Sequence, residues 1–262
     1  MRLFKPLLQI SNIVGLIAVI FFNYVANTGV ISGNTVGQVS NSFDSLFAPA
    51  GYTFAIWGVI YVGLIGFSIY QARDLFSNSR KNVPMLLQIT GWFGLTCAAN
   101  IVWLVAWLNE RIGVSWLLML ALLGGLVILY VQLGIGVRKP KDRMEQYFLL
   151  IPFSLYLGWI CVATIANGSS FLVSLQWNGF GLPPELWAIL MMAVASVLGI
   201  MFVIYRNDWV IAGVIAWALG GIAVKNFSQG SSSGQIVGMA AITGILALAS
   251  AYFLRRRKLA SS

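Results

Sequence analysis

Threonine, asparagine and tryptophan side chains recur at helical spacing in one apolar stretch of the chain. The members of this stripe are Thr96, Asn100, Trp103 and Trp107. Their intervals of four, three and four residues place them on one face of a helix. An unsatisfied amide in hydrocarbon costs several kcal/mol, so Asn100 must have a partner. A bond between helices and a contact with a ligand both remain open for it.

Two further apolar stretches carry comparable stripes. One contains Phe54, Trp57 and Tyr61, and the other contains Pro152, Tyr156, Trp159, Ala163 and Asn167. Ala163 would leave a notch beside an indole, which suits either the close approach of another helix or a flat ligand. Indole rings present broad apolar faces for stacking. The three stripes therefore predict a binding site for a flat hydrophobic molecule.

Other chemistry is poorly represented in the chain. There is no His, which removes the commonest general base and an axial imidazole for haem. Cys97 and Cys161 fall inside apolar runs and are interpreted as small buried hydrophobes. We find no nucleophile with its base and no metal-ligand cluster, so we expect no catalytic residue, no metal site and no enzyme. Slow photochemistry on a bound ligand stays open.

The elements that must position these stripes are membrane helices. The chain is 59% hydrophobic and 9% charged, whereas soluble domains carry about 25% charged residues. Its apolar runs reach the roughly 20 residues that cross a bilayer. We predict an all-α, polytopic helical membrane protein with eight spans, at about 7–27, 50–72, 84–108, 113–137, 145–167, 184–204, 208–225 and 233–254.

The cations predict how these spans are oriented. Of the 16 Lys and Arg residues, all except Arg111 and Lys225 fall on one side of the eight-span arrangement. Because cytoplasmic loops are rich in Lys and Arg, we expect both termini in the cytoplasm, with a bacterial plasma membrane as the location. The basic surplus is thus a topology signal, and no nucleic-acid partner is expected.

Two long connections lie on the outer side of this arrangement. Thr28–Pro49 is rich in Gly, Ser and Asn but also contains apolar residues, which favours a lid or binding loop over a passive linker. Gly168–Pro183 mixes Phe171, Trp177 and Phe180 with small polar residues. We interpret it as an interfacial segment with an aromatic anchor.

The stripes contain short motifs in a defined order. They are Pro49, Trp57 and Tyr61 in FAPAGYTFAIWGVIY, Asn100 and Trp103 in AANIVW, and Trp159, Ala163, Thr164 and Asn167 in WICVATIAN. Together these motifs resemble those of the TspO family, the tryptophan-rich sensory proteins related to the mitochondrial translocator protein, or peripheral-type benzodiazepine receptor. The run before the second helix, Ala-Pro-Ala-Gly, departs from the family's Trp-Thr-Pro-Pro.

The motifs cover residues 1–170, which we predict to be a TspO-like membrane domain of five helices. Members of the family normally stop there, whereas residues 171–262 would form three additional membrane helices with a basic tail. The chain therefore resembles a divergent member of the family. The small residues of its last helices suit close packing between helices.

The resemblance implies a membrane binding or sensory protein whose ligand is a tetrapyrrole such as a porphyrin, with no other cofactor. The candidate ligand-binding residues are Phe54, Trp57, Tyr61, Asn100, Trp103, Trp107, Tyr156, Trp159, Ala163, Thr164 and Asn167. The expected partners are the lipid bilayer and a hydrophobic small molecule, and a homodimer is left open. A small-solute transporter and an accessory subunit of a larger membrane complex are the alternatives.

Overall fold

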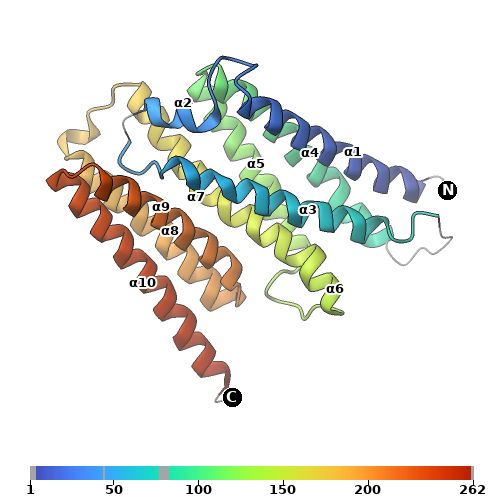
Figure 1. Ribbon diagram of the computed structural model, residues 1–262. Helices are drawn as coiled ribbons and strands as arrows, with labels where there is room; N and C mark the ends of the chain where they lie inside the picture. Colours follow the sequence, from blue (N-terminus) through green and yellow to red (C-terminus); the bar gives the residue numbers. More distant parts are fainter. Residues whose placement is uncertain (1–3, 44, 77–82, 261–262) are drawn as a thin grey trace. The chain divides into compact units, whose positions relative to one another are not determined.

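A computed structural model describes residues 4–43, 45–76 and 83–260, and every regular element in these ranges is helical (Figure 1). The elements are α1 (Phe4–Asn27), α2 (Val36–Ser42), the 3₁₀ turn η1 (Gly51–Ala55), α3 (Ile56–Ala72), α4 (Val83–Leu108), α5 (Ile112–Gln132), α6 (Arg143–Glu145), the π-helical turn η2 (Gln146–Leu150), α7 (Ile151–Ser174), the 3₁₀ turn η3 (Gly179–Gly181), α8 (Pro184–Arg206), α9 (Trp209–Ser228) and α10 (Ser232–Ala260).

The predicted all-α membrane architecture is confirmed. Within the described ranges, 8 helical stretches are long and apolar enough to cross a bilayer. Each of them overlaps one predicted span. Because hydrocarbon offers no hydrogen-bond partners to the backbone, helices that satisfy their own backbone are the expected spanning elements. Arg2, Arg80 and Lys81, which we assigned to the inner side, lie outside the described residues.

The predicted outer connection at Gly168–Pro183 is partly wrong, because α7 continues to Ser174. Gly168 and the serines that follow it favour a turn in sequence, but Ser170 Oγ donates to the Ala166 carbonyl at 3.2 Å, one turn back. Such a bond satisfies the hydroxyl locally, so the helix can continue through polar residues. The true connection is therefore short and includes η3.

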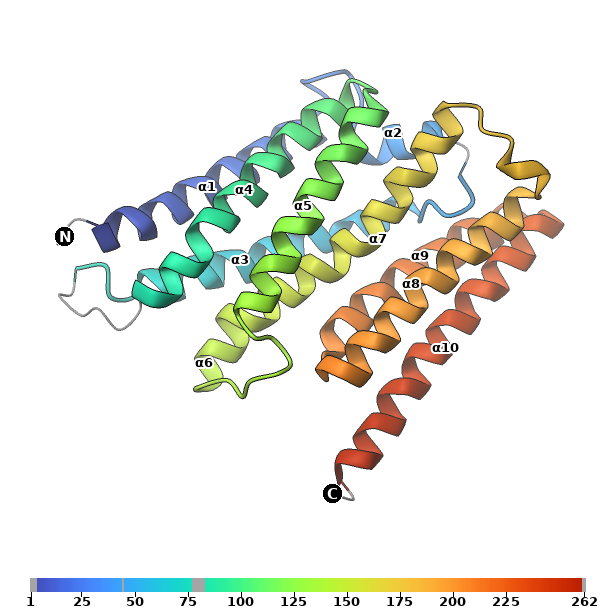
Figure 2. The ribbon, with the colours of Figure 1, turned by 180° about the vertical axis from the view of Figure 1, so that it is seen from behind.

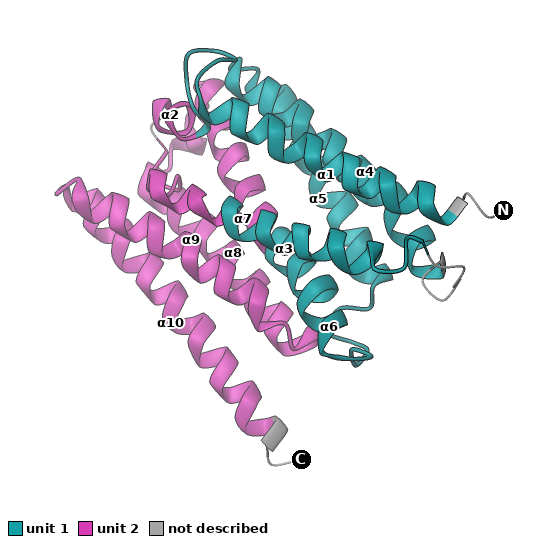
Figure 3. Cartoon of the chain, turned by 45° about the vertical axis from the view of Figure 1, so that its right-hand side comes forward, with its two compact units in different colours: residues 1–36, 57–157 teal, residues 37–56, 158–262 magenta. Residues whose placement is uncertain are grey.

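The described chain forms two compact units, which Figure 3 colours separately. Unit 1 comprises Met1–Val36 and Trp57–Leu157, and unit 2 comprises Gly37–Ile56 and Gly158–Ser262. Helix α7 contributes its first residues to unit 1 and the rest to unit 2. The predicted division after residue 170 stays a prediction.

Unit 1 is held by ring packing and by buried amides. Helix α4 packs against both α1 and α5 (Figure 2). The Phe67 ring makes edge contacts with Phe93 and Phe153, at centroid distances of 5.3 and 5.2 Å. Gln9 Nε2 donates to the Gln71 carbonyl at 2.5 Å. Lipid is as apolar as the side chains, so such contacts take the place of the hydrophobic effect in joining membrane helices.

Unit 2 is held by close helix approach at small residues. Helices α8, α9 and α10 pack against one another. Leu248 and Ile215 fill the space over Gly199, and the Phe227 ring covers Gly238. A side chain at either glycine would displace these neighbours. The predicted close packing at small residues is thus confirmed at Gly238, whereas a Cβ atom at Gly213 or Gly220 would meet nothing within 4 Å.

Candidate functional site

Five rings of the predicted site come together in unit 1, and we call them the aromatic cluster. They are Trp57, Tyr61, Trp103, Trp107 and Tyr156. The Trp57 and Tyr61 rings stack at 5.5 Å between centroids and 21° between planes. Trp103 and Trp107 stack at 6.2 Å and 21°. Trp57 joins the two stacks, because its ring lies 6.4 Å from that of Trp103 at 32°.

The local sequence explains this geometry. Trp57 and Tyr61 are one turn apart in α3, and Trp103 and Trp107 are one turn apart in α4. Side chains four residues apart on a helix lie one above the other, so each helix supplies one stack. Tyr156 from α7 adds an edge contact on Trp57, with the centroids 5.8 Å apart at 68°. The predicted sharing of a helix face is therefore confirmed for Trp57 with Tyr61 and for Trp103 with Trp107.

Asn100 lies beside the cluster in α4 and is fully buried. Its Oδ1 accepts a hydrogen bond of 2.9 Å from Asn23 in α1, and its Nδ2 donates to the Tyr156 hydroxyl at 3.3 Å. The interpretation of Asn100 as a bond between helices is confirmed. Sequence reasoning missed Asn23, although an amide within an apolar helix could have drawn attention to it, since it must find a partner in hydrocarbon.

Two polar atoms of the cluster are buried and have no hydrogen-bond partner among the described residues. They are Trp103 Nε1 and the Tyr61 hydroxyl. By contrast, Trp107 Nε1 donates to the Val36 carbonyl at 3.2 Å. A buried polar group without a partner costs about 1–3 kcal/mol. A ligand with acceptor atoms would recover that cost at these two positions.

The other predicted site residues belong to unit 2. Phe54 meets the buried Trp159 edge-on at 5.8 Å. Thr164 Oγ1 donates to the Ile160 carbonyl at 2.7 Å, so its hydroxyl is satisfied within α7. Asn167 is buried and Ala163 is half-buried. Unit 2 therefore contains Trp159 and Ala163 of the predicted stripe, and the notch beside the indole stays a prediction.

Helix α9 holds the segment Ser45–Ala55, which sequence reasoning did not predict. Trp217 Nε1 donates to the Thr53 carbonyl at 3.0 Å, and Asn226 Nδ2 donates to the Leu46 carbonyl at 2.9 Å. The Gly221 carbonyl accepts from the Ala50 amide at 3.1 Å. Part of the predicted lid is thus bound to α9 through its backbone. The lid role itself stays a prediction for Thr28–Pro49.

The fold defines a multi-pass helical membrane protein, and unit 1 brings five of its predicted rings into one aromatic cluster. A family model described as "TSPO-like protein" matches residues 9–254. The chain belongs to this family, as its motifs predicted. The match includes the last three helices, beyond the residues 1–170 on which those motifs lie. No curated protein and no solved structure matches the chain.

Proposed function

We propose that the protein binds a flat hydrophobic molecule at the aromatic cluster and acts as a membrane receptor or sensor for it. The observation that supports this most directly is the pair of ring stacks in α3 and α4, joined through Trp57 and Trp103. Near-parallel indoles provide stacking faces, and membership of the TSPO-like family agrees with a binding role. The buried Trp103 Nε1 and Tyr61 hydroxyl are then donors for polar atoms of the ligand.

A tetrapyrrole is the ligand class that we propose. Its macrocycle is flat and apolar, and its nitrogen and carboxylate atoms can accept hydrogen bonds. The chain has no His, so an axial imidazole is not available, and a porphyrin would be held by stacking and burial. Because the rings of the cluster touch one another, we expect them to rotate as the ligand enters.

Titration with protoporphyrin IX, followed by intrinsic tryptophan fluorescence, tests this function in the purified full-length protein. We expect saturable quenching that Trp103→Phe weakens about 3- to 10-fold, the equivalent of one hydrogen bond and part of a stacking contact. Trp209→Phe is the matched control, because Trp209 is an exposed residue at the start of α9. Equal affinity in both variants would remove the cluster as the site.

Flux of the same porphyrin into proteoliposomes separates binding from transport. A binding protein holds the ligand without moving it across the bilayer, so we expect no flux above that of protein-free vesicles. Co-purification from native membranes would show whether the protein also belongs to a larger complex. Saturable flux would replace the receptor with a transporter.

We also propose that both termini face the cytoplasm of a bacterial cell, on the strength of the cation distribution. Single-cysteine variants at exposed loop positions test this with a membrane-impermeant maleimide. We expect labelling of Asn34→Cys and Gly230→Cys in intact cells, and labelling of Lys139→Cys only after lysis. Cys97 and Cys161 are buried and leave a low background. The reverse pattern would invert the orientation.

A further inference from the structure

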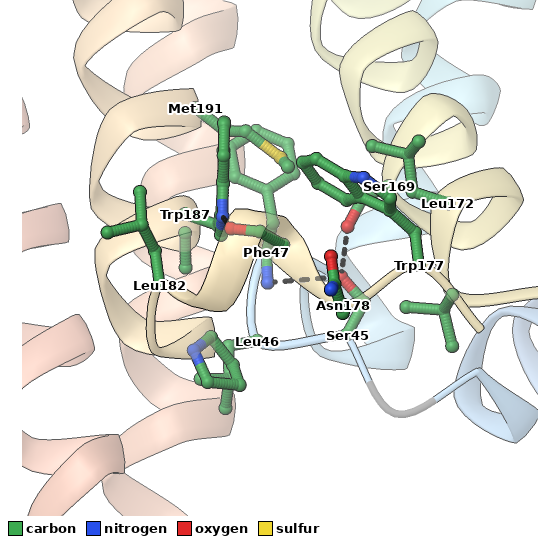
Figure 4. A pocket seen from close by; sticks show the side chains of 14 residues that line it. Ser45, Leu46, Phe47, Ser169, Leu172, Trp177, Asn178, Leu182, Trp187 and Met191 are labelled. Carbon is green, nitrogen blue, oxygen red and sulfur yellow. Dashed lines mark hydrogen bonds between the residues drawn. The ribbon is translucent and has the colours of Figure 1, made fainter.

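A cavity of about 360 Å³ lies within unit 2. Figure 4 shows that its walls come from three segments: residues 45–47, the end of α7, and the chain from residue 177 into the start of α8. The residues of α8 that line the cavity are Pro184, Trp187, Ala188 and Met191. Their spacing places them on one face of the helix. The volume falls within the range of pockets that bind small molecules.

Most of the cavity wall is apolar, with a small group of hydrogen-bonding atoms. Phe47, Leu172, Trp187 and Met191 are among its lining residues. None of the residues that line it is charged. A pocket of this kind disfavours an ionic ligand, because burying an unpaired charge is costly. The wall therefore selects a neutral and largely apolar molecule.

The polar group is a pair of buried hydroxyls. Ser45 Oγ and Ser169 Oγ lie 2.7 Å apart and share one hydrogen bond. Ser45 Oγ also accepts from the Phe47 amide at 3.3 Å. A hydroxyl has one donor and two acceptor positions, so the pair retains both a donor and an acceptor. A ligand hydroxyl or carbonyl group fits this arrangement.

Two contacts join the residues of the cavity wall between Trp177 and Trp187. Trp187 Nε1 donates to the Gly179 carbonyl at 2.8 Å, and the Trp177 ring lies 4.9 Å from that of Trp187. The turn between Trp177 and Trp187 contains two residues with positive φ, Gly179 at 64° and Phe180 at 54°. A positive φ is unfavourable for Phe180, because it has a side chain, so the surrounding structure must hold it in this conformation. Residues of this kind cluster at ligand-binding elements.

The position of the cavity indicates where its ligand comes from. It lies at adjoining ends of two membrane-spanning helices, α7 and α8. Tryptophan is enriched where membrane helices reach the headgroup level, and this cavity has Trp177 and Trp187 in its wall. Val173 and Leu182 also line it and are each 41% exposed. We therefore expect an apolar molecule to enter the cavity from the bilayer, past these two exposed side chains.

We propose that this cavity binds a neutral amphiphile from the bilayer, whose hydroxyl or carbonyl head bonds to Ser45 and Ser169 and whose apolar body lies against Trp177 and Trp187. This site is separate in its residues from the aromatic cluster. It also gives the additional helices a function, since α8 provides one wall. The chain would then have two ligand sites of different chemistry.

Photolabelling with a diazirine derivative of decanol tests the proposal in the full-length protein in nanodiscs. We expect saturable labelling that maps by mass spectrometry to peptides within residues 169–191. Decanol should compete, while decanoate and decylammonium should compete at least tenfold less well because their charges cannot be buried there. Equal competition by the three compounds, or labelling spread evenly over the lipid-facing helices, would overturn the proposal.

A pair of neighbouring serine variants separates the head-group contact from general effects on folding. Ser169→Ala should raise the decanol concentration for half-maximal competition about fivefold, the loss expected for one hydrogen bond. Ser170→Ala is the matched control, because Ser170 is also buried in α7 but bonds to the Ala166 carbonyl. Leu182→Trp, at an exposed wall position, should reduce labelling by filling space. Identical competition curves for both serine variants would reject the contact.

Discussion

The contact between Gly221 and Thr53 allows a sharp test of how α9 holds the segment before α3. A Cβ atom built on Gly221 would overlap Thr53 Oγ1 and lie 3.0 Å from Thr53 Cβ and Cγ2. Thr53 is fully buried and its carbonyl is bound by Trp217. Its side chain therefore has little room to move aside. Substitution of Gly221 by Ala must shift the segment or the helix.

The expected cost of Gly221→Ala is about 1–3 kcal/mol, the usual penalty for adding a methyl group to a packed interior. Gly220→Ala is the matched control on the same helix turn, because nothing lies within 4 Å of a Cβ atom at Gly220. It should be neutral or stabilise the helix by up to about 1 kcal/mol. The two variants are thus expected to differ in the free energy of unfolding by about 1–4 kcal/mol.

Thermal unfolding of the purified protein, followed by tryptophan fluorescence, measures the difference. The midpoint should fall by about 2–4 °C for each kcal/mol lost. Thr53→Ala removes Oγ1 and Cγ2 and should recover more than half of the loss when combined with Gly221→Ala, since the residues are in direct contact. If Gly221→Ala is as stable as Gly220→Ala, or if the double variant is no better than the single one, the contact does not hold the segment.

Two further stability predictions concern unit 1. Asn100→Leu should lower the free energy of unfolding by about 1–2 kcal/mol, because it removes the hydrogen bonds between α1, α4 and α7. The double variant with Asn23→Leu should lose less than the sum of the two single losses. A double-mutant cycle in thermal unfolding measures this. Arg138→Ala should cost about 1–3 kcal/mol, because Arg138 forms two hydrogen bonds of 2.9 and 3.0 Å with the buried carboxylate of Glu145. Lys139→Ala at the exposed neighbour is the control, and an equal loss there would contradict the role of the ion pair.

The eight spans were predictable from sequence, and so were the aromatic faces of α3 and α4 that form the aromatic cluster. Hydropathy reports spans well because a backbone in hydrocarbon must satisfy its own hydrogen bonds, so each span is encoded within its own residues. The two ring stacks were predictable because each of them also lies within a single helix. Trp57 with Tyr61 and Trp103 with Trp107 are separated by one helical turn, which local periodicity alone brings together.

The end of α7 and the choice of partners could not be predicted in the same way. Gly168 and Ser170 are typical of a turn in sequence, but in the structure the Ser170 hydroxyl bonds to the turn before it and the helix continues to Ser174. Asn100 left two interpretations open because an amide can bond to a helix or to a ligand equally well. Asn23 settles its structural partner, and the two are 77 residues apart.

The local pattern of the chain thus encodes its membrane helices and their aromatic faces, since both follow from residues within a few turns of one another. Contacts between residues far apart in the sequence decide how the helices and the segment before α3 are joined. Trp217 reaches the Thr53 carbonyl across 164 residues of chain, and Ser45 meets Ser169 across 124. No periodicity links such distant positions. They meet because the helices pack around them, which is how α9 comes to hold the segment before α3 and how α8 comes to line the cavity in unit 2.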